Sequence, residues 1–231
     1  MPGINNISFS FPGQDLFSGI SMDIPERKIS CILGPSGCGK TTLLNLICNI
    51  LKPSAGTIEG FEGSSFSYIF QETRILPWKT VFENVSFPLK GRYSRDEIEE
   101  KAGRFIDLVE LSGWRNHHPS HLSGGMKQRI AIARAFAFPS HTILMDEAFQ
   151  ALDIALKNKL FEVFLRSWEE EPRTVVFVTH DLNEALLLGN YINVMTKPPV
   201  RSVKTFRLDG EPGEGREIHP GLKSELNGLL G

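Results

Sequence analysis

The sequence lacks the features that mark membrane-spanning, secreted or disulfide-bonded chains. It contains no unbroken apolar run of about 18 residues, the length that a membrane helix needs, so we expect any membrane role to depend on a partner. Residues 1–6 have neither the basic start nor the apolar stretch of a signal peptide. The three cysteines, Cys31, Cys38 and Cys48, include no CxxC pair, which argues against a disulfide framework and a zinc site. These absences favour a reduced, cytosolic environment.

The sequence also has little net charge, with 25 Lys and Arg against 27 Asp and Glu and a formal charge of −2. This balance gives no electrostatic reason to expect a nucleic-acid partner. Hydrophobic residues at 41% and charged residues at 23% are close to globular averages, so we expect a folded chain. A length of 231 residues suits one large core or two small lobes that share one.

Apolar β-branched runs alternate with segments of helical periodicity. Residues 142–145 and 174–178 are continuous apolar runs typical of strands buried on both faces, and residues 29–33 form a compact β-prone run that ends before Gly34. Residues 95–111 have the apolar spacing of a helix, and the first thirty residues alternate as short antiparallel strands do. Strands that alternate with helices indicate an α/β fold with a parallel sheet.

We expect residues 1–231 to form a single domain built from distinct parts. The α/β core, with a β subdomain, would comprise about residues 1–70 and 139–200. A mainly helical subdomain, about residues 71–138, would be inserted between these two halves. The residues after Lys197 are rich in Pro and Gly, so residues 201–231 are expected to form a loosely built C-terminal tail.

One segment matches the phosphate-binding pattern G-x-x-x-x-G-K-[ST] without a mismatch, between an expected strand and an expected helix. Glycines let the backbone curl so that successive N–H groups point at phosphate oxygens, and the helix that follows offers its positive N-terminal end. Lys40 would reach the β- and γ-phosphates of ATP, and the Thr41 hydroxyl would coordinate Mg²⁺. The positions expected to contact the nucleotide here are Gly34, Pro35, Ser36, Gly37, Cys38, Gly39, Lys40, Thr41 and Thr42.

A second segment, residues 142–147, is an apolar strand that ends in Asp146 and Glu147. In open parallel sheets, ligands bind at the carboxyl edge of the strands. Asp146 would hold Mg²⁺, and Glu147 would polarise a water for attack on the γ-phosphate. Such a strand end is common when taken alone. Paired with the phosphate loop, it predicts the second half of a nucleotide site.

Residues 122–129, Leu-Ser-Gly-Gly-Met-Lys-Gln-Arg, distinguish among the classes of P-loop protein. Ser123 is a good helix N-cap, and Gly124 and Gly125 expose backbone N–H groups at a helix start, which predicts a second anion site. The segment resembles the LSGGQ signature of the ATP-binding-cassette (ABC) ATPases, and it lies just upstream of Asp146 as it does in that family. The resemblance extends over about residues 4–200.

Further positions follow the order of the ABC motifs. Phe11 lies where the family places an aromatic residue that stacks on adenine, and Gln71 matches the Q-loop glutamine. Residues 151–153, Ala-Leu-Asp, match the D-loop, and His180 matches the switch histidine. The resemblance implies that hydrolysis depends on Glu147, His180, Gln71 and Lys40, and that Mg²⁺ is held by Thr41, Gln71 and Asp146.

The sequence departs from the family pattern at a few positions. Phe11 replaces the commoner Tyr, which keeps the stacking face and loses the hydroxyl. Met126 replaces the commoner Gln of the signature, and Ala148 replaces a frequent Pro. Because none of these changes removes a group needed for phosphate chemistry, we expect a competent ATPase.

The resemblance also implies a fold and a set of partners. The fold would be that of a P-loop NTPase, a RecA-like parallel sheet core with an N-terminal antiparallel β subdomain and an inserted helical subdomain. Two such subunits, here expected to form a homodimer, would close face to face, with each signature capping ATP on the other chain. Further expected partners are integral-membrane permeases and a solute-binding protein, at the cytoplasmic face of the cell membrane. Residues 71–85, with Leu76-Pro77-Trp78, are similar to the nitrate/sulfonate/taurine group of importers.

Several alternatives stay open at the level of sequence. Trp78 either contributes with residues 75–77 to an apolar docking patch or packs into the helical lobe. The motor of an exporter or lipoprotein-release system would share every catalytic motif, whereas a single cassette without a heptad run disfavours a soluble ABC ATPase that acts on DNA or ribosomes. His117, His118 and His121 have no acidic or cysteine ligand nearby, which favours a polar loop over a metal site. The transported solute cannot be read from this subunit.

Overall fold

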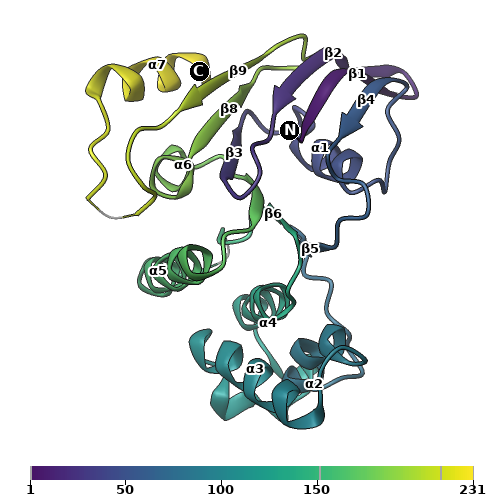
Figure 1. Ribbon diagram of the computed structural model, residues 1–231, viewed down its shortest axis with the longest axis vertical. Helices are drawn as coiled ribbons and strands as arrows, with labels where there is room; N and C mark the ends of the chain where they lie inside the picture. Colours follow the sequence, from purple (N-terminus) through teal and green to yellow (C-terminus); the bar gives the residue numbers. More distant parts are fainter. Residues whose placement is uncertain (1, 151, 214, 231) are drawn as a thin grey trace.

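The computed structural model describes residues 2–150, 152–213 and 215–230, and Figure 1 shows an α/β core above a helical lobe. The main sheet has six strands in the order β5-β6-β7-β3-β8-β9, and only β9 runs antiparallel to its neighbour. Its strands are β3 (Ile29–Leu33), β5 (Phe66–Ile69), β6 (Thr142–Asp146), β7 (Thr174–Val178), β8 (Tyr191–Met195) and β9 (Val203–Arg207). Every residue of β3, β6 and β7 is buried, which for β6 and β7 confirms the prediction from their continuous apolar runs.

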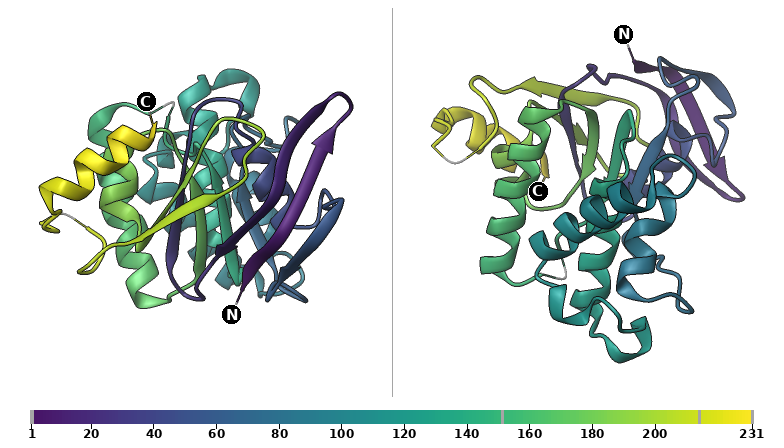
Figure 2. Two further views of the ribbon diagram at one scale, coloured as in Figure 1. Left: turned by 90° about the horizontal axis from the view of Figure 1, so that it is seen from above. Right: turned by 60° about the horizontal axis from the view of Figure 1, so that its bottom comes forward.

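The N-terminal residues form a separate antiparallel sheet, as their alternating pattern predicts. In this sheet β1 (Gly3–Phe11) pairs with β2 (Gln14–Asp23) on one side and with β4 (Ala55–Glu59) on the other. Figure 2 shows this sheet on one side of the main sheet, with α5 and α7 on the opposite side. Its apolar side chains and those of α1 (Lys40–Ile47) share a core with alternate residues of the main sheet.

Helices cover the other face of the main sheet and build the lower lobe. In the lobe, α4 (Gly124–Ala137) packs on α2 (Val81–Ser86) and α3 (Arg95–Leu108), and it also contacts β5, so it joins the lobe to the core. The remaining elements are α5 (Ile154–Glu170), α6 (Leu182–Leu188), α7 (Pro220–Leu230) and the 3-10 turns η1 (Phe87–Leu89), η2 (Ser112–Trp114) and η3 (Pro119–His121).

The helices α2 to α6 begin at side-chain caps that the sequence supplies. A side-chain oxygen accepts a hydrogen bond from a backbone N–H of the first turn, and the capping residues are Thr80, Ser94, Ser123, Asp153 and Asp181. Among the described residues, no helix is both long enough and apolar enough to cross a membrane.

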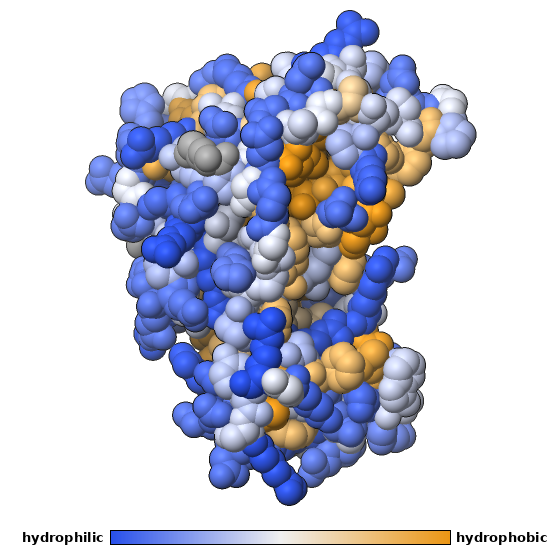
Figure 3. Space-filling model, turned by 45° about the vertical axis from the view of Figure 1, so that its right-hand side comes forward, coloured by the Kyte–Doolittle hydropathy of each residue, from blue (hydrophilic) through white to orange (hydrophobic). Residues whose placement is uncertain are grey.

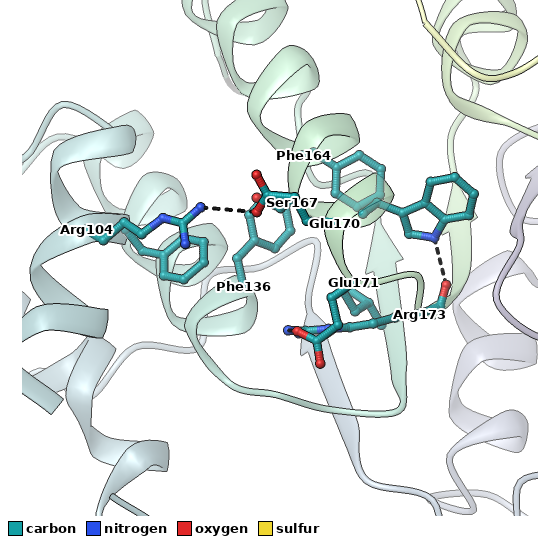
Figure 4. Close-up of a pocket in the computed structure, with 10 residues that line it drawn as sticks. Arg104, Phe136, Phe164, Ser167, Glu170, Glu171 and Arg173 are labelled. Atoms are coloured by element: carbon teal, nitrogen blue, oxygen red, sulfur yellow. Dashed lines mark hydrogen bonds and ion pairs between the residues drawn. The ribbon is translucent and has the colours of Figure 1, made fainter. Parts of the chain in front are cut away.

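A small cavity of about 90 Å³ lies where the helical lobe meets the core, and its lining is shown in Figure 4. Phe136 of α4 stacks on Phe164 of α5, with ring centroids 5.5 Å apart. Arg104 of α3 forms an ion pair with Glu170 of α5 across the opening, at 3.7 Å. Packed aromatic rings and exposed ion pairs, which include Lys159 of α5 with Glu110 after α3, therefore help to attach the lobe to the core.

The expectation of a loosely built C-terminal tail is wrong. Val203–Arg207 forms β9 on the edge of the main sheet, and α7 packs its Leu226 into the core. The guanidinium of Arg216 holds the connecting segment by donating to the carbonyl oxygens of Leu186 and Gly189 at the end of α6. Pro and Gly between these elements shorten the periodic runs, which is why the pattern alone did not reveal them.

Candidate nucleotide site

The phosphate loop connects β3 to α1 in a conformation that only glycine adopts without strain. Gly37 has a φ of 77° and Gly39 a φ of 98°. A Cβ atom on Gly39 would lie 2.8 Å from side-chain atoms of both Leu16 and Phe17, which are buried in the core. A Cβ atom on Gly37 would meet no atom within 4 Å. The loop thus follows its predicted course because β2 packs directly against it.

We expect Gly39→Ala to destabilise the protein more than Gly37→Ala does. Both substitutions place alanine at a positive φ, which costs about 1–2 kcal/mol, and only Gly39→Ala adds a clash with Leu16 and Phe17. Since 1 kcal/mol corresponds to about 2–4 °C at this chain length, Gly39→Ala should lower Tm by several degrees more than its control. Thermal unfolding followed by circular dichroism measures both, and equal Tm values would contradict this account of the loop.

Lys40, the first residue of α1, is buried against the phosphate loop. Its Nζ donates to the carbonyl oxygens of Gly34 at 2.8 Å and Pro35 at 3.1 Å. The ammonium is therefore held at the loop by the backbone that is predicted to bind phosphate. A cation fixed in this position favours an anionic ligand.

Thr41 and Asp146 lie together beside the loop, although they come from different elements. Asp146 is 2% exposed at the end of β6, where burial raises the pKa of its carboxyl and the nearby Thr41 hydroxyl opposes part of that rise. A buried carboxylate next to a hydroxyl supplies the hard oxygen donors that Mg²⁺ prefers. The donor set therefore fits the predicted metal.

Glu147 and His180 meet at the same edge of the main sheet. The Glu147 backbone N–H donates to Val178 O at 2.9 Å, which joins the ends of β6 and β7. His180, just beyond β7, places its Nδ1 3.5 Å from Oε2 of Glu147. Glu147 has a φ of 48°, an uncommon conformation for a residue with a side chain and one that is enriched at functional sites. The topology thus brings together two groups that are 33 residues apart in their numbering.

Gln71 and Phe11 are both exposed. Gln71 follows β5, and β5 runs parallel to β6 with Ile69 opposite Met145, so Gln71 lies at the same sheet edge as Asp146. Phe11 is 44% exposed at the β1–β2 turn, and its ring stands edge-on to Phe9. The aromatic face needed for stacking on adenine is accessible there.

The signature segment begins α4 in the helical lobe, whereas the phosphate loop belongs to the core. Ser123 caps the helix, and its Oγ accepts from Met126 N at 3.3 Å. A Cβ atom on Gly124 would meet nothing within 4 Å, so the helix start is open. Ser123, Gly124 and Gly125 therefore lie at a second helix N-terminus, separate from that of α1. Figure 1 draws α4 in the lower lobe and α1 in the core.

The structure adds a contact that the motifs did not identify. Gln128 of α4 is buried, and its Nε2 donates to Ala148 O at 2.8 Å, directly after Glu147. Its place in the signature helix was visible in the sequence, but its partner is set by the packing of α4 on the core. Asp153 caps α5 as the D-loop motif ends, while Ala151 of that motif lies outside the described residues.

Comparison with known proteins decides the family. A family model described as ABC transporter matches residues 17–150 of this chain. The taurine import ATP-binding protein TauB of Chromobacterium violaceum is 38% identical over 212 residues, which cover 88% of this chain and 81% of that protein. The chain belongs to the ABC transporter family.

Other ABC proteins agree with this assignment. The aliphatic sulfonates import ATP-binding protein SsuB of Bacillus cereus is 37% identical over 209 residues, covering 85% of this chain and 81% of that protein. The dimeric structure of a bacterial ABC transporter cassette matches 91% of this chain and 100% of its own, with a TM-score of 0.82 and 31% identity. A post-hydrolysis dimer of the same cassette, bound to ADP and Pi, has a TM-score of 0.79 at 30% identity. The ABC fold, with its parallel core and antiparallel subdomain, is thereby confirmed.

Proposed function

We propose that this ABC protein binds and hydrolyses ATP as the motor subunit of a membrane importer. The observation that carries the proposal is the convergence of the phosphate loop, Asp146, Glu147 and His180 at one edge of the main sheet. These groups lie at the ends of β3, β6 and β7, which are neighbouring strands of the main sheet. The fold, and not any single motif, therefore brings them to a shared edge. The edge is also where parallel sheets bind ligands.

Each group at this edge has a distinct part in the proposed reaction. Lys40 and the N–H groups of the loop bind the phosphates, and the ring of Phe11 stacks on adenine. Glu147 accepts the proton of the attacking water, and His180 beside it holds the region of the γ-phosphate. Thr41, Asp146 and Gln71 would hold Mg²⁺, which supplies charge neutralisation of the phosphates when bound.

The signature segment serves a second copy of the chain in this proposal. Ser123, Gly124 and Gly125 offer backbone N–H groups at the open start of α4. Because this helix start lies in a different lobe from Lys40, we infer that it caps ATP bound to a partner subunit in a homodimer. The dimeric form of the similar cassette supports this arrangement.

The import role rests on relatives and on an exposed apolar surface. TauB and SsuB are named as import proteins, so we infer permease partners, a solute-binding protein, and a position at the cytoplasmic face of the membrane. A groove beside β5 and η1 is lined by Leu76, Phe87, Pro88 and Phe138 together with Arg134. Figure 3 shows apolar side chains gathered above and below an indentation on the side of the molecule that carries α2. Taurine and other sulfonates are the solute class that the names of these relatives indicate.

Trp78 follows Leu76, a residue of this groove, by two positions and does not pack into the lobe. Its side chain is 70% exposed, and Phe87 is 50% exposed, so the alternative of a buried core tryptophan is wrong. Leu76 is held at the groove because its N–H donates to Asn84 Oδ1 at 2.7 Å. The backbone of this segment is also tied to α4, since Arg134 Nη2 donates to Arg74 O at 2.6 Å. We infer that a cytoplasmic helix of the permease docks here.

We expect Trp78→Ala to weaken association with the permease by a factor of roughly 30, because truncating a buried aromatic anchor costs about 2 kcal/mol. Basal ATPase activity of the free subunit should stay within a few-fold of wild type, since Trp78 touches no group of the nucleotide site. Titration of permease in detergent with labelled subunit measures the dissociation constant. Trp114→Ala is the matched control, because Trp114 is also an exposed tryptophan of the lobe and lies in η2, away in sequence from the Leu76 segment that lines the groove. Equal losses in the two variants would contradict docking at Trp78.

A further inference from the structure

The carboxylate of Glu184, four residues after His180, is buried and forms contacts that are not part of the nucleotide site described above. Glu184 on α6 is 6% exposed. Its Oε1 accepts from Lys157 Nζ at 2.6 Å, and its Oε2 accepts from Thr179 Oγ1 at 2.7 Å. A charge this deeply buried is tolerated only when it is paired and hydrogen-bonded, and here both oxygens are engaged.

The Thr179 end of this network fixes the backbone on both sides of His180. Thr179 donates its N–H to Ile32 O at 3.2 Å, and its Oγ1 accepts from Asp181 N at 3.0 Å. The Thr179 hydroxyl thus accepts a hydrogen bond from the residue after His180 and donates one to Glu184. The His180 side chain is 53% exposed, so few packing contacts hold it in place. Its direction toward Glu147 depends on the backbone that Thr179 secures.

The Lys157 end connects the same carboxylate to α5. Lys157 lies in the first turns of that helix, and its backbone N–H donates to the carbonyl oxygen of the capping Asp153 at 2.9 Å. Glu184 therefore joins the start of α5, the end of β7 and α6 through one side chain. An ion pair of this kind orients its carboxylate, because the ammonium restricts the direction of the oxygens.

We propose that Glu184 is a positioning residue for His180. Held by Lys157, its carboxylate accepts the Thr179 hydroxyl and so keeps His180 within reach of Glu147. The proposal rests on ATP hydrolysis at this site, as proposed above. A misplacement of 1 Å in an active site costs up to about 10²-fold in rate, so the network has a measurable consequence.

The test compares two neutral replacements that differ mainly in the hydrogen-bond acceptor. Removing Glu184 alone would leave the Lys157 ammonium unpaired, so each variant also carries Lys157→Met. In Glu184→Gln/Lys157→Met the amide oxygen still accepts from Thr179, whereas in Glu184→Leu/Lys157→Met nothing does. We expect kcat to fall at least tenfold in the leucine variant and to stay within about threefold of wild type in the glutamine variant. The dissociation constant for a fluorescent ATP analogue should change less than twofold in both.

Thr179→Val tests the same contact from the other side. It should lower kcat by a factor similar to that of the leucine variant, and combining the two changes should add less than a further twofold. Lys204→Met/Glu225→Gln is the control, because this exposed ion pair lies between β9 and α7, and it should leave kcat unchanged.

The outcomes separate this proposal from the proposed function. Equal kcat values for the leucine and glutamine variants, or a loss of ATP affinity that accounts for the fall in rate, would overturn the positioning role while leaving ATP hydrolysis intact. A wild-type chain that binds ATP without hydrolysing it would overturn the proposed function and the positioning role together.

Discussion

Replacing Glu147 by glutamine should lower ATP turnover by at least about 10²-fold while ATP binding is retained. A general base contributes about 10²–10⁴-fold to rate, and the neutral amide cannot accept the proton of the attacking water. The amide keeps the size of the side chain, so the strained backbone at Glu147 and the contact of its N–H with Val178 O should persist. Phosphate release in the steady state measures turnover, and equilibrium binding of a fluorescent ATP analogue measures affinity.

A matched carboxylate elsewhere on the chain controls for the loss of charge. Glu169 is exposed on α5, and Glu169→Gln should leave both turnover and affinity at the wild-type level. Undiminished hydrolysis by Glu147→Gln would refute the assignment of Glu147 as the base. It would leave His180 and Asp146 as the remaining candidates at this edge.

The second large effect concerns the signature segment. In the Glu147→Gln background, which should accumulate the ATP-bound state, Ser123→Arg is expected to abolish the ATP-dependent dimer. Ser123 lies at the open start of α4, and a long side chain there would occupy the space that the partner's nucleotide needs. The affinity of the monomer for ATP should remain within about threefold, because Ser123 is in a different lobe from Lys40.

Size-exclusion chromatography with light scattering, with and without ATP and Mg²⁺, measures the dimer. Ser202→Arg is the control, since it places the same side chain at an exposed position between β8 and β9 and should leave the dimer intact. If Ser123→Arg lowered monomer affinity as far as Lys40→Ala does, the two segments would serve one nucleotide, and the composite site would be wrong.

Local chemistry explains which parts of the site were predictable from sequence. The phosphate loop needs positive φ at Gly39 and a lysine at the helix start, and both requirements act within a few residues. Asp146 ends a fully buried strand and Glu147 follows it, so their place at a sheet edge follows from the apolar run alone. The contact of Glu147 with His180 required only the rule that parallel strands end at a common edge.

Long-range packing explains what was missed. Glu184 lies in a mostly apolar helix, and the local sequence does not indicate that Lys157 and Thr179 contact it, because they come close only once α5 and β7 are in place. Gln128 likewise finds Ala148 O through the docking of α4 on the core. The strand β9 is short and pairs at a sheet edge, where its neighbours matter more than its own periodicity. For Trp78, only the packed lobe could decide between burial and exposure.

The central claim is that this chain hydrolyses ATP at the edge formed by Lys40, Asp146 and Glu147. Its most direct test is phosphate release from ATP by the purified wild-type chain, measured beside Glu147→Gln with Mg²⁺ present or chelated. The account predicts release by the wild type that requires Mg²⁺ and nearly disappears in Glu147→Gln. Release at the same rate from both proteins, or none from a wild-type chain saturated with ATP and Mg²⁺, would contradict it.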